Sequence, residues 1–387
     1  MRIPMAETKR LIALDVFRGA TIALMILVNN PGTWGAIYPP LKHAAWHGWT
    51  PTDFVFPFFL FIVGVAMAFA FRKYDYKLNR SAMMKIIKRT LIIYGLGLFL
   101  NLLRPVGGEN FGEWINNLFG TWRLVGVLPR IALCYFFASI LVLKCNRKCV
   151  LWISAGILVS YWILLASTGG FGIEDSLVRK IDIAILGESH IYGGYRDSLG
   201  QAIRFDPEGL LSTLPAIVTT IMGFFIGMMI LETGDKKQLV KKMLIRAVAL
   251  IALGWLWGLF FPINKPIWSS SYVLFMGGWA MLFLALAILI IDILGWKSAT
   301  EPFVVFGSNP LFIFVLSSLY AKFLAYTKWI QVDGVAVSTK TWLFDKVMMP
   351  LANNSVIDAS LLFALTTITI FWAISLVLYR KKIFIKI

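Results

Sequence analysis

Long apolar runs with almost no charge recur along the whole chain and constrain the fold more than any other feature. Ten of them approach the roughly 20 residues that a helix needs to cross a hydrocarbon core of about 30 Å. They are Leu11–Val28, Phe54–Phe71, Ile86–Leu103, Leu124–Leu143, Val150–Thr168, Gly209–Leu231, Ala247–Ile263, Tyr272–Ile291, Pro302–Ala321 and Ala359–Tyr379. Because the runs are continuous and do not alternate, they predict helices rather than the strands of a membrane barrel. We therefore expect an all-α, polytopic membrane bundle of about ten transmembrane helices, forming one domain over residues 1–387.

Composition also indicates a lipid environment. Apolar residues make up 59% of the chain and charged residues only 15%, against about 25% charged residues in soluble domains. The mean hydropathy is +0.76. A soluble protein of this length cannot bury that much apolar surface, so an integral membrane protein surrounded by lipids is expected.

The net charge of +17 follows membrane topology rather than a nucleic-acid-binding surface, because no basic stripe interleaves with aromatic residues. With a cytoplasmic N-terminus, 23 of the 37 Lys and Arg residues fall in short cytoplasmic segments and 12 in longer external loops. The positive-inside rule then places both termini in the cytoplasm. We expect no nucleic-acid partner, and a site built from the external loops Asn29–Asp53, Ser167–Glu208 and Lys322–Asp358.

Two of the three histidines lie in the first external loop, which is rich in Trp, Pro and Gly. His43 and His47 are four apart, a spacing that suits zinc on a helix. No Glu accompanies them and Gly48 argues against a long helix, so no metal site is expected. Two interpretations stay open: both histidines belong to an interfacial aromatic belt, or His43 is catalytic.

Ionisable residues inside apolar runs are candidates for function. Asp15 and Arg18 are three apart and can pair on one helix face. Arg123 and Arg130 are seven apart, which predicts one face of the fourth helix. An arginine deep in the membrane suits a phosphate because its guanidinium can form bidentate hydrogen bonds. A structural pair of Arg130 with Asp15 or Asp53 fits equally well.

Three carboxylates near the ends of runs have both a structural and a functional interpretation. Asp53 and Asp206 read as helix N-caps, with Glu208 in the first turn of the sixth run. Since they are expected on the same side as His43, they could instead bind a cationic or hydroxyl-rich acceptor. Separately, Asn309-Pro310 interrupts the ninth run, and such breaks occur where they line a cavity or other protein.

Motifs spread in order along the whole chain resemble one family. They are Leu14–Gly19, Val28-Asn29, Lys42–Gly48, Asp53–Pro57, Gly126–Arg130, Asp206–Gly209, Lys265–Tyr272 and Gly307–Pro310. Together these stretches resemble the lysosomal heparan-α-glucosaminide N-acetyltransferases and their bacterial relatives.

The resemblance implies an enzyme that moves an acetyl group from cytosolic acetyl-CoA, its co-substrate, to an amino sugar or glycan across the membrane. It implies His43 as the active-site histidine and Asn29 as its partner. We assign substrate binding to Asp53, Asp206 and Glu208. Binding of acetyl-CoA is assigned to Arg18, Arg130, Lys265, Ser271 and Asn309. A bacterial inner membrane is the expected location, and a homodimer is left open.

The expected chemistry is sound on its own terms. An amine must lose a proton before it attacks a thioester, and a histidine can accept that proton or carry the acetyl group itself. Two other functions stay open. Ten spans, a broken helix and buried charges also fit a transporter or flippase, and an O-acyltransferase of cell-surface glycans would use similar residues.

Overall fold

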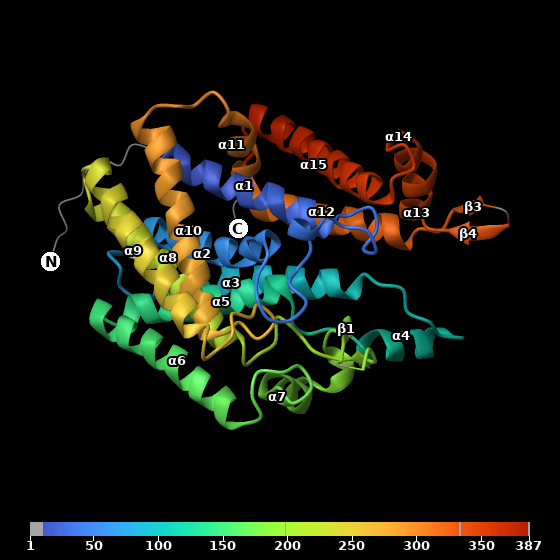
Figure 1. The fold of residues 1–387 in the computed structure, drawn as a ribbon, viewed down its shortest axis with the longest axis horizontal. Helices are drawn as coiled ribbons and strands as arrows, with labels where there is room; N and C mark the ends of the chain where they lie inside the picture. The colour runs from blue at the N-terminus through green and yellow to red at the C-terminus, as the bar shows by residue number, and fades with distance from the viewer. Residues whose placement is uncertain (1–10, 198, 333, 386–387) are drawn as a thin grey trace.

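Helices account for most of the chain in the computed structural model, which describes residues 11–197, 199–332 and 334–385. The helices are α1 Ile12–Asn29, α2 Val55–Phe71, α3 Arg80–Leu102, α4 Phe111–Gly120, α5 Val127–Lys144, α6 Arg147–Ser167, α7 Leu177–Leu186, α8 Thr213–Glu232, α9 Lys236–Trp257, α10 Ser270–Ala287, α11 Glu301–Ser308, α12 Pro310–Tyr326, α13 Thr339–Leu343, α14 Met349–Leu351 and α15 Val356–Arg380 (Figure 1). Besides short 3₁₀ and π-helical segments, the described residues form two short antiparallel strand pairs. They pair β1 Tyr195–Arg196 with β2 Ala202–Ile203, and β3 Ile330–Val332 with β4 Val335–Val337.

Within these ranges, seven helices are long and apolar enough to cross a membrane: α1, α2, α5, α6, α8, α10 and α15. The pair α11 and α12 adds an eighth span if it is counted as one. The two helices are bent by 83° at Asn309-Pro310, which confirms the predicted break. The all-α membrane class is therefore confirmed.

The two remaining predicted spans correspond to α3 and α9, and both begin among basic residues. α3 has 23 residues and α9 has 22, so each has the length of a span. The seventh run was expected to reach Ile263, but α9 ends at Trp257 because a turn and Pro262 follow. The count of ten spans and the placement of both termini stay predictions, and the basic residues before Leu11 lie outside the described ranges.

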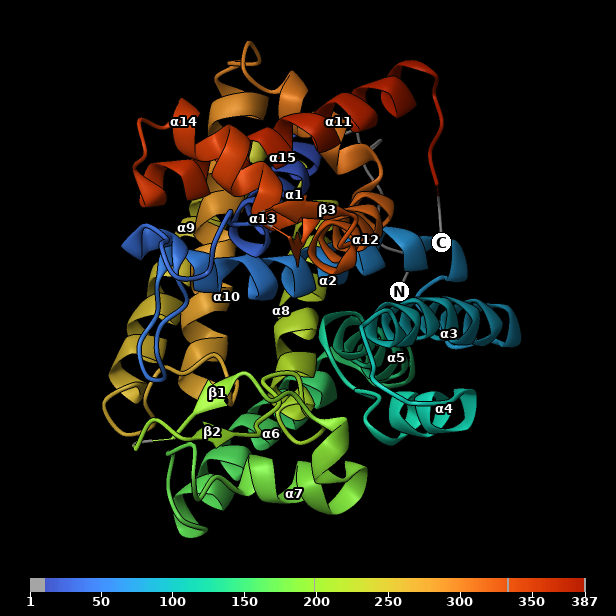
Figure 2. The same cartoon turned by 90° about the vertical axis from the view of Figure 1, so that its right-hand side faces the viewer.

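The centre of the bundle is the contact between α2 and α8. In Figure 2, α3, α4 and α5 lie to one side of α8, and α9 and α10 lie to the other. A Cβ added at Gly64 would lie 1.9 Å from the carbonyl oxygen of Thr220, and one at Gly223 would lie 2.0 Å from that of Phe61. Only residues without a side chain allow these two backbones to approach so closely.

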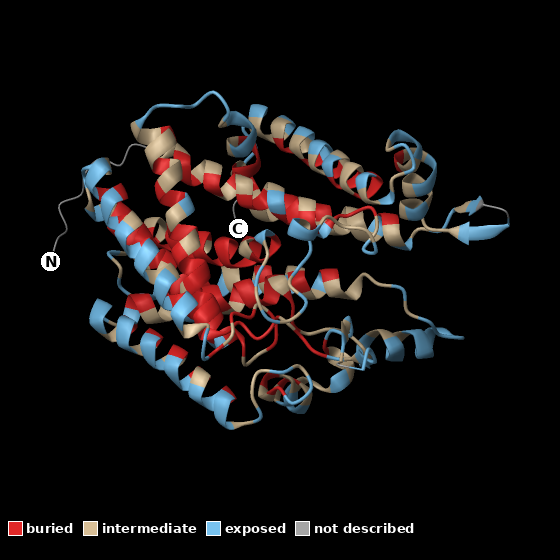
Figure 3. Ribbon diagram, in the orientation of Figure 1, coloured by how far each residue is buried: buried red, intermediate tan, exposed pale blue. Residues whose placement is uncertain are grey.

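Burial separates the inner from the outer faces of the bundle. Buried residues gather at the centre, and the outward faces of α6, α9 and α15 are largely exposed (Figure 3). Those exposed faces carry large apolar side chains, including Trp152, Ile245 and Val377. Exposed apolar faces on long helices are expected of surfaces that contact lipid tails.

Two helix starts differ from the sequence prediction. The sixth run was expected to begin at Gly209 with Asp206 as N-cap, but residues 206–212 form turns and α8 begins at Thr213. Asp206 is therefore not a helix cap. The fourth run was expected from Leu124, but Gly126 has a φ of 142° and α5 begins at Val127. Arg123 therefore lies in the preceding loop and not on a helix face with Arg130.

Candidate active site

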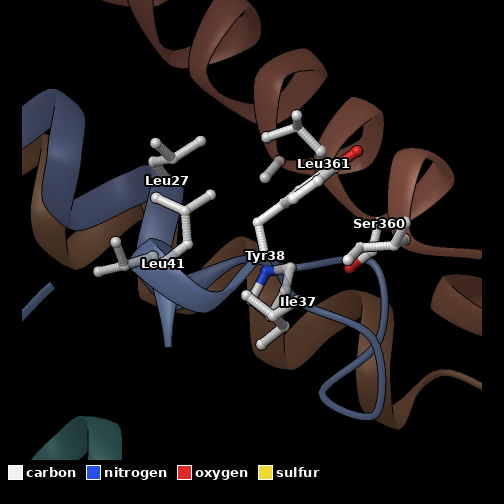
Figure 4. A pocket seen from close by; sticks show the side chains of 10 residues that line it. Leu27, Ile37, Tyr38, Leu41, Ser360 and Leu361 are labelled. Atoms are coloured by element: carbon white, nitrogen blue, oxygen red, sulfur yellow. The ribbon is translucent and has the colours of Figure 1, made fainter. Parts of the chain in front are cut away.

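Four connecting loops meet to form the site: residues 30–54, 121–126, 187–212 and 258–269. The first loop is held against α15. The backbone N–H of Gly32 donates to the carbonyl oxygen of Ser360 at 3.1 Å, and the N–H of Thr33 donates to the Ser360 hydroxyl at 3.2 Å. The Tyr38 hydroxyl bonds the carboxylate of Asp358. Figure 4 shows the Tyr38 side chain lying between this loop and α15. These contacts fix the loop that carries His43.

His43 pairs with Asp53 ten residues later. The Nδ1 atom of His43 lies 2.7 Å from Oδ1 of Asp53, whose side chain is only 1% exposed. The other carboxylate oxygen accepts from the backbone N–H groups of Ala44 (3.1 Å) and Thr50 (3.0 Å). Asp53 was also interpreted as a helix N-cap, but it lies inside the 3₁₀ turn Pro51–Phe54, where it forms a capping box with Thr50. It therefore supports the turn and the imidazole together.

Lys265 lies against the same pair. Its Nζ atom is 3.0 Å from Nδ1 of His43 and 3.4 Å from Oδ1 of Asp53, and its side chain is 16% exposed. Burial lowers the pKa of Lys265, although the carboxylate of Asp53 opposes that shift. The residue was expected to bind acetyl-CoA, and the structure places it at the histidine.

The second pair of carboxylates is joined by Arg123. Its Nε and Nη2 atoms donate to the two Asp206 oxygens at 2.7 and 2.6 Å, and Nη2 also donates to Glu208 at 2.6 Å. Burial opposes the charge on Arg123, but both carboxylates outweigh it, so the pKa of Arg123 is raised. Asp206 is fully buried and also accepts from the N–H of Tyr192 at 3.0 Å. Asp206 therefore acts on the site through Arg123.

These side chains surround a cavity of about 360 Å³, within the range usual for small-molecule sites. Its wall includes the following side chains: Trp34, His43, Asp53, Arg123, Tyr192, Tyr195, Glu208 and Lys265. The His43 side chain is 45% exposed, so a molecule in the cavity can reach its ring. The structure thus brings together four of the predicted site residues: His43, Asp53, Glu208 and Lys265.

Asn29 lies in a neighbouring cavity. It is the last residue of α1 and lines a space of about 210 Å³ that also borders Trp34, Tyr320 and Lys322. Trp34 is part of both cavities, so the cavity of Asn29 and the cavity of His43 share this wall residue. The predicted partnership of Asn29 and His43 stays a prediction.

Arg130 and Ser271 lie behind the cavity, in the protein interior. Arg130 is 1% exposed, donates to the carbonyl oxygen of Gly209 at 3.0 Å, and bonds the Ser212 hydroxyl. It pairs with neither Asp15 nor Asp53, although either was open from the sequence. Ser271 donates to the carbonyl oxygen of Phe261 at 2.5 Å. Both side chains thus bind neighbouring loops.

Arg18 and Asn309 lie at the contact of α1 with α11. Arg18 pairs with Asp15 at 3.3 Å, as the spacing predicted, and approaches the carbonyl oxygen of Gly307 at 3.4 Å. The Asn309 side chain accepts from the N–H of Ile385 at 2.7 Å and donates to the carbonyl oxygen of Ile383 at 3.0 Å. The five residues assigned to acetyl-CoA are therefore divided among separate places, and that assignment stays a prediction.

Sequence reasoning did not assign Trp34, Tyr192, Tyr195 or Arg123 to this cavity. The charge of Arg123 beside an apolar run was a signal, but its partners come from a loop more than 80 residues away. No histidine, cysteine or carboxylate cluster able to hold a metal is found in the described ranges. His47, which the sequence spacing had paired with His43, lies against another residue: its Nδ1 atom is 3.3 Å from the amide nitrogen of Asn264.

The fold and the site define a class: a helical membrane protein whose connecting loops enclose a polar cavity with a His–Asp pair. No family model matches the chain. It is similar to human heparan-alpha-glucosaminide N-acetyltransferase, with 26% identity over 98% of this chain and 60% of the relative. It is also similar to the mouse protein of that name, with 25% identity over 99% and 61%.

The chain thus spans about 60% of the length of the curated relatives it matches. Similarity over nearly the whole chain supports a family-level relationship and confirms the resemblance predicted from the motifs.

Proposed function

We propose that this chain is a transmembrane acetyltransferase that transfers the acetyl group of acetyl-CoA to the amine of a glucosamine-type sugar. The observation that carries the proposal is the His43–Asp53 pair at 2.7 Å, on the wall of a polar cavity in a membrane bundle. The similarity to two proteins named as N-acetyltransferases supports the same reaction class.

In the proposed reaction, Asp53 orients the imidazole. A carboxylate can only accept, so Nδ1 of His43 carries the proton that it donates to Asp53, and Nε2, which lies 3.4 Å from Nζ of Lys265, keeps the lone pair that accepts a proton. Nε2 then removes a proton from the sugar ammonium, and the amine attacks the thioester carbonyl. The C–S bond breaks, the acetyl group forms an amide, and the thiolate of CoA leaves and takes up a proton.

An alternative order uses His43 as the acetyl carrier. Nε2 attacks the thioester first, CoA leaves, and the sugar amine then takes the acetyl group from the imidazole. In both orders the ammonium of Lys265, which lines the same cavity as His43, would stabilise negative charge that develops on the carbonyl oxygen.

The proposed direction of transfer follows the charge pattern of the sequence. The four loops around the cavity belong to the side expected to be external, and acetyl-CoA is expected from the cytoplasm, through an inner membrane. Glu208 and Arg123, which share the cavity wall with His43, supply an acceptor and a donor for sugar hydroxyls.

The test is acetyl transfer from labelled acetyl-CoA to glucosamine by the purified, detergent-solubilised full chain. His43→Ala and Asp53→Asn are expected to reduce kcat by about 10²–10⁴-fold, the usual contribution of a positioned base. Asp175→Asn is the matched control, because that carboxylate is exposed and lies outside the cavity.

The possible outcomes separate the remaining functions. Transfer that persists in His43→Ala would remove this residue from the proposed mechanism. Acetylation of hydroxyl groups in N-acetylglucosamine, without acetylation of glucosamine, would favour the O-acyltransferase. No transfer and no binding of acetyl-CoA would favour the transporter or flippase.

A further inference from the structure

Two further spaces share wall residues with the active-site cavity or with each other. The first is the 210 Å³ space described above, here called the Asn29 cavity. The second, here called the lateral groove, measures about 750 Å³ and lies between the end of α3, α4 and α12. Trp34 borders the active-site and Asn29 cavities, while Lys322 and Tyr326 border the Asn29 cavity and the lateral groove. The three spaces therefore lie side by side, and the Asn29 cavity shares wall residues with each of the other two.

The lateral groove has the character of a site for a hydrocarbon chain. Its wall consists mainly of Leu102, Leu103, Leu118, Leu319 and Phe323. Phe323 is 49% exposed, so the groove opens on the outer surface of α12. A molecule in the bilayer can reach such a groove sideways without crossing water.

The short helix α4 beside the groove carries aromatic side chains typical of a membrane interface. It exposes Phe111, Trp114 and Phe119, and Trp114 also lines the groove. Aromatic side chains of this kind gather where hydrocarbon meets lipid headgroups. In Figure 2, α4 lies at the edge of the molecule beside α3 and α5.

Cations without acidic partners lie where the groove meets the Asn29 cavity. Arg104 and Lys322 line the groove, Lys322 and Lys340 line the Asn29 cavity, and neither wall contains an Asp or Glu among the residues that the structure describes. Lys322 donates to the carbonyl oxygen of Leu103 at 3.0 Å, which leaves two of its three N–H groups for a ligand. Nη2 of Arg104 donates to the carbonyl oxygen of Leu118 at 3.3 Å and to the Thr121 hydroxyl, while its buried Nε atom has no hydrogen-bond partner within the described ranges. This arrangement is complementary to an anion.

We propose that the lateral groove binds the sugar acceptor and that this acceptor is an amino sugar linked through a phosphate to a membrane lipid. The lipid chain lies in the groove, the phosphate binds Lys322 and Arg104, and the sugar extends through the Asn29 cavity towards His43. This inference rests on the proposed function and names its acceptor class. The transferred bond is unchanged: the sugar nitrogen gains the acetyl group and CoA leaves as its thiol.

The experiment compares three acceptors with the full chain in lipid nanodiscs. Glucosamine has neither chain nor phosphate, octyl glucosaminide has a neutral chain, and farnesyl-phosphoryl glucosamine has both. We expect kcat/KM to be at least tenfold higher for the third acceptor than for the second, because each charged hydrogen bond contributes substantially to binding.

Variants test the assigned residues. Lys322→Met combined with Arg104→Gln is expected to reduce the ratio of kcat/KM for farnesyl-phosphoryl glucosamine to kcat/KM for octyl glucosaminide about tenfold or more. Leu319→Trp, which fills the groove, is expected to lower kcat/KM for both chain-bearing acceptors relative to glucosamine, and it provides an independent test if the double variant fails to fold. Lys328→Met is the matched control, because this exposed lysine lines neither space.

The outcomes distinguish this inference from the proposed function. Transfer to glucosamine with no preference for farnesyl-phosphoryl glucosamine would overturn the lipid-linked acceptor and leave the acetyltransferase intact. Full inhibition of transfer to farnesyl-phosphoryl glucosamine by phosphatidylglycerol at the same concentration as this acceptor would show that the groove binds ordinary lipid headgroups. That result would also overturn the lipid-linked acceptor. No transfer to any of the three acceptors would overturn both.

Discussion

Asp53 shows how one side chain serves both the local fold and the proposed chemistry. One of its oxygens holds the N–H groups of Ala44 and Thr50, and the other holds Nδ1 of His43. Its backbone carbonyl accepts from the hydroxyl of Tyr272 at 2.7 Å. Because all these groups are fixed by the fold, the imidazole does not have to be ordered when substrate binds.

Among the residues of the cavity wall, Arg123 is expected to reduce protein stability most when it is replaced. Arg123→Met leaves the buried carboxylates of Asp206 and Glu208 without their cation, which costs about 3–5 kcal/mol when a buried pair is broken. The melting temperature in detergent should fall. Arg123→Lys should recover only part of the lost melting temperature, because an ammonium cannot replace the bidentate contact with the carboxylate. Arg196→Met, at an exposed arginine, is the control. An unchanged melting temperature for Arg123→Met would contradict the role assigned to this network.

Asp182 should make stability depend on pH. The residue is fully buried, one oxygen accepts from the N–H of Leu210 at 2.8 Å, and the other has no partner within the described ranges. Burial raises the pKa of Asp182 to about 7, against the opposing effect of that N–H group. Between about pH 4 and pH 7 the unfolded carboxyl is therefore ionised while the folded one keeps its proton. The free energy of unfolding falls as pH rises through that window, by about 1.4 kcal/mol for each pH unit.

The variant Asp182→Asn stays neutral at every pH, so it lacks this loss of stability. We expect its melting temperature to exceed that of the native chain at about pH 8 by clearly more than at about pH 4.5. Thermal unfolding in the same detergent at both pH values measures the difference. A gap between the two proteins that stays constant with pH would show that Asp182 does not titrate in this range.

At the scale of elements, the two helices that approach each other most closely in the core each follow a loop of the site. α2 and α8 approach through Gly64 and Gly223, and each of these helices is preceded by a loop that carries site residues. The 83° bend between α11 and α12 lies at Asn309, whose side chain binds the backbone of residues 383 and 385. The break predicted from Asn309-Pro310 is thus surrounded by protein, as expected of non-helical backbone at membrane depth.

Gly223→Ala tests the contact between α2 and α8. The added Cβ would lie 2.0 Å from the carbonyl oxygen of Phe61, so the helices must separate and lose packing, which typically costs about 1–3 kcal/mol or more. A lower melting temperature and a smaller folded fraction on gel filtration are expected. Gly156→Ala is the matched control, because a Cβ there meets nothing within 4 Å among the described residues. Equal behaviour of the two variants would refute the close contact.

At the scale of the whole molecule, loops from distant parts of the chain close around one cavity. His43, Arg123, Glu208 and Lys265 come from four different connections between helices. For these loops to meet, they must all emerge at the same end of the bundle. Which side of the membrane this end faces stays a prediction from the positions of Lys and Arg.

Cysteine labelling in intact cells tests the orientation. The partly exposed Cys145 and Cys149 are first replaced by Ser, and the buried Cys134 is kept. Gln201→Cys, in the loop between β1 and β2, should react with a membrane-impermeant maleimide in intact cells. Lys237→Cys, in the first turn of α9, should react only after permeabilisation. The reverse pattern would overturn the predicted topology.

Several features could be predicted from the sequence because they depend on local chemistry. Apolar runs of spanning length predict helices wherever they occur, and the pair Asp15–Arg18 follows from helical spacing alone. The assignment of His43 and Lys265 as site residues came from motifs and stays a prediction. The start of α8 could not be predicted, because Asp206 and Pro207 form an acceptable cap locally, yet Asp206 binds Arg123 more than 80 residues away.

The sequence by itself therefore determined that this chain is a helical membrane protein and where its main helix break lies, since hydrophobic length and proline act locally. Only the tertiary structure decided which polar residues share a cavity. It placed Asn29 and His43 on two cavities that share Trp34, placed Lys265 on the His43–Asp53 pair, and left Ser271 and Asn309 bonded to backbone groups. The physical reason is that buried polar groups take whichever partner the packing brings within about 3 Å, however far apart the two are in sequence.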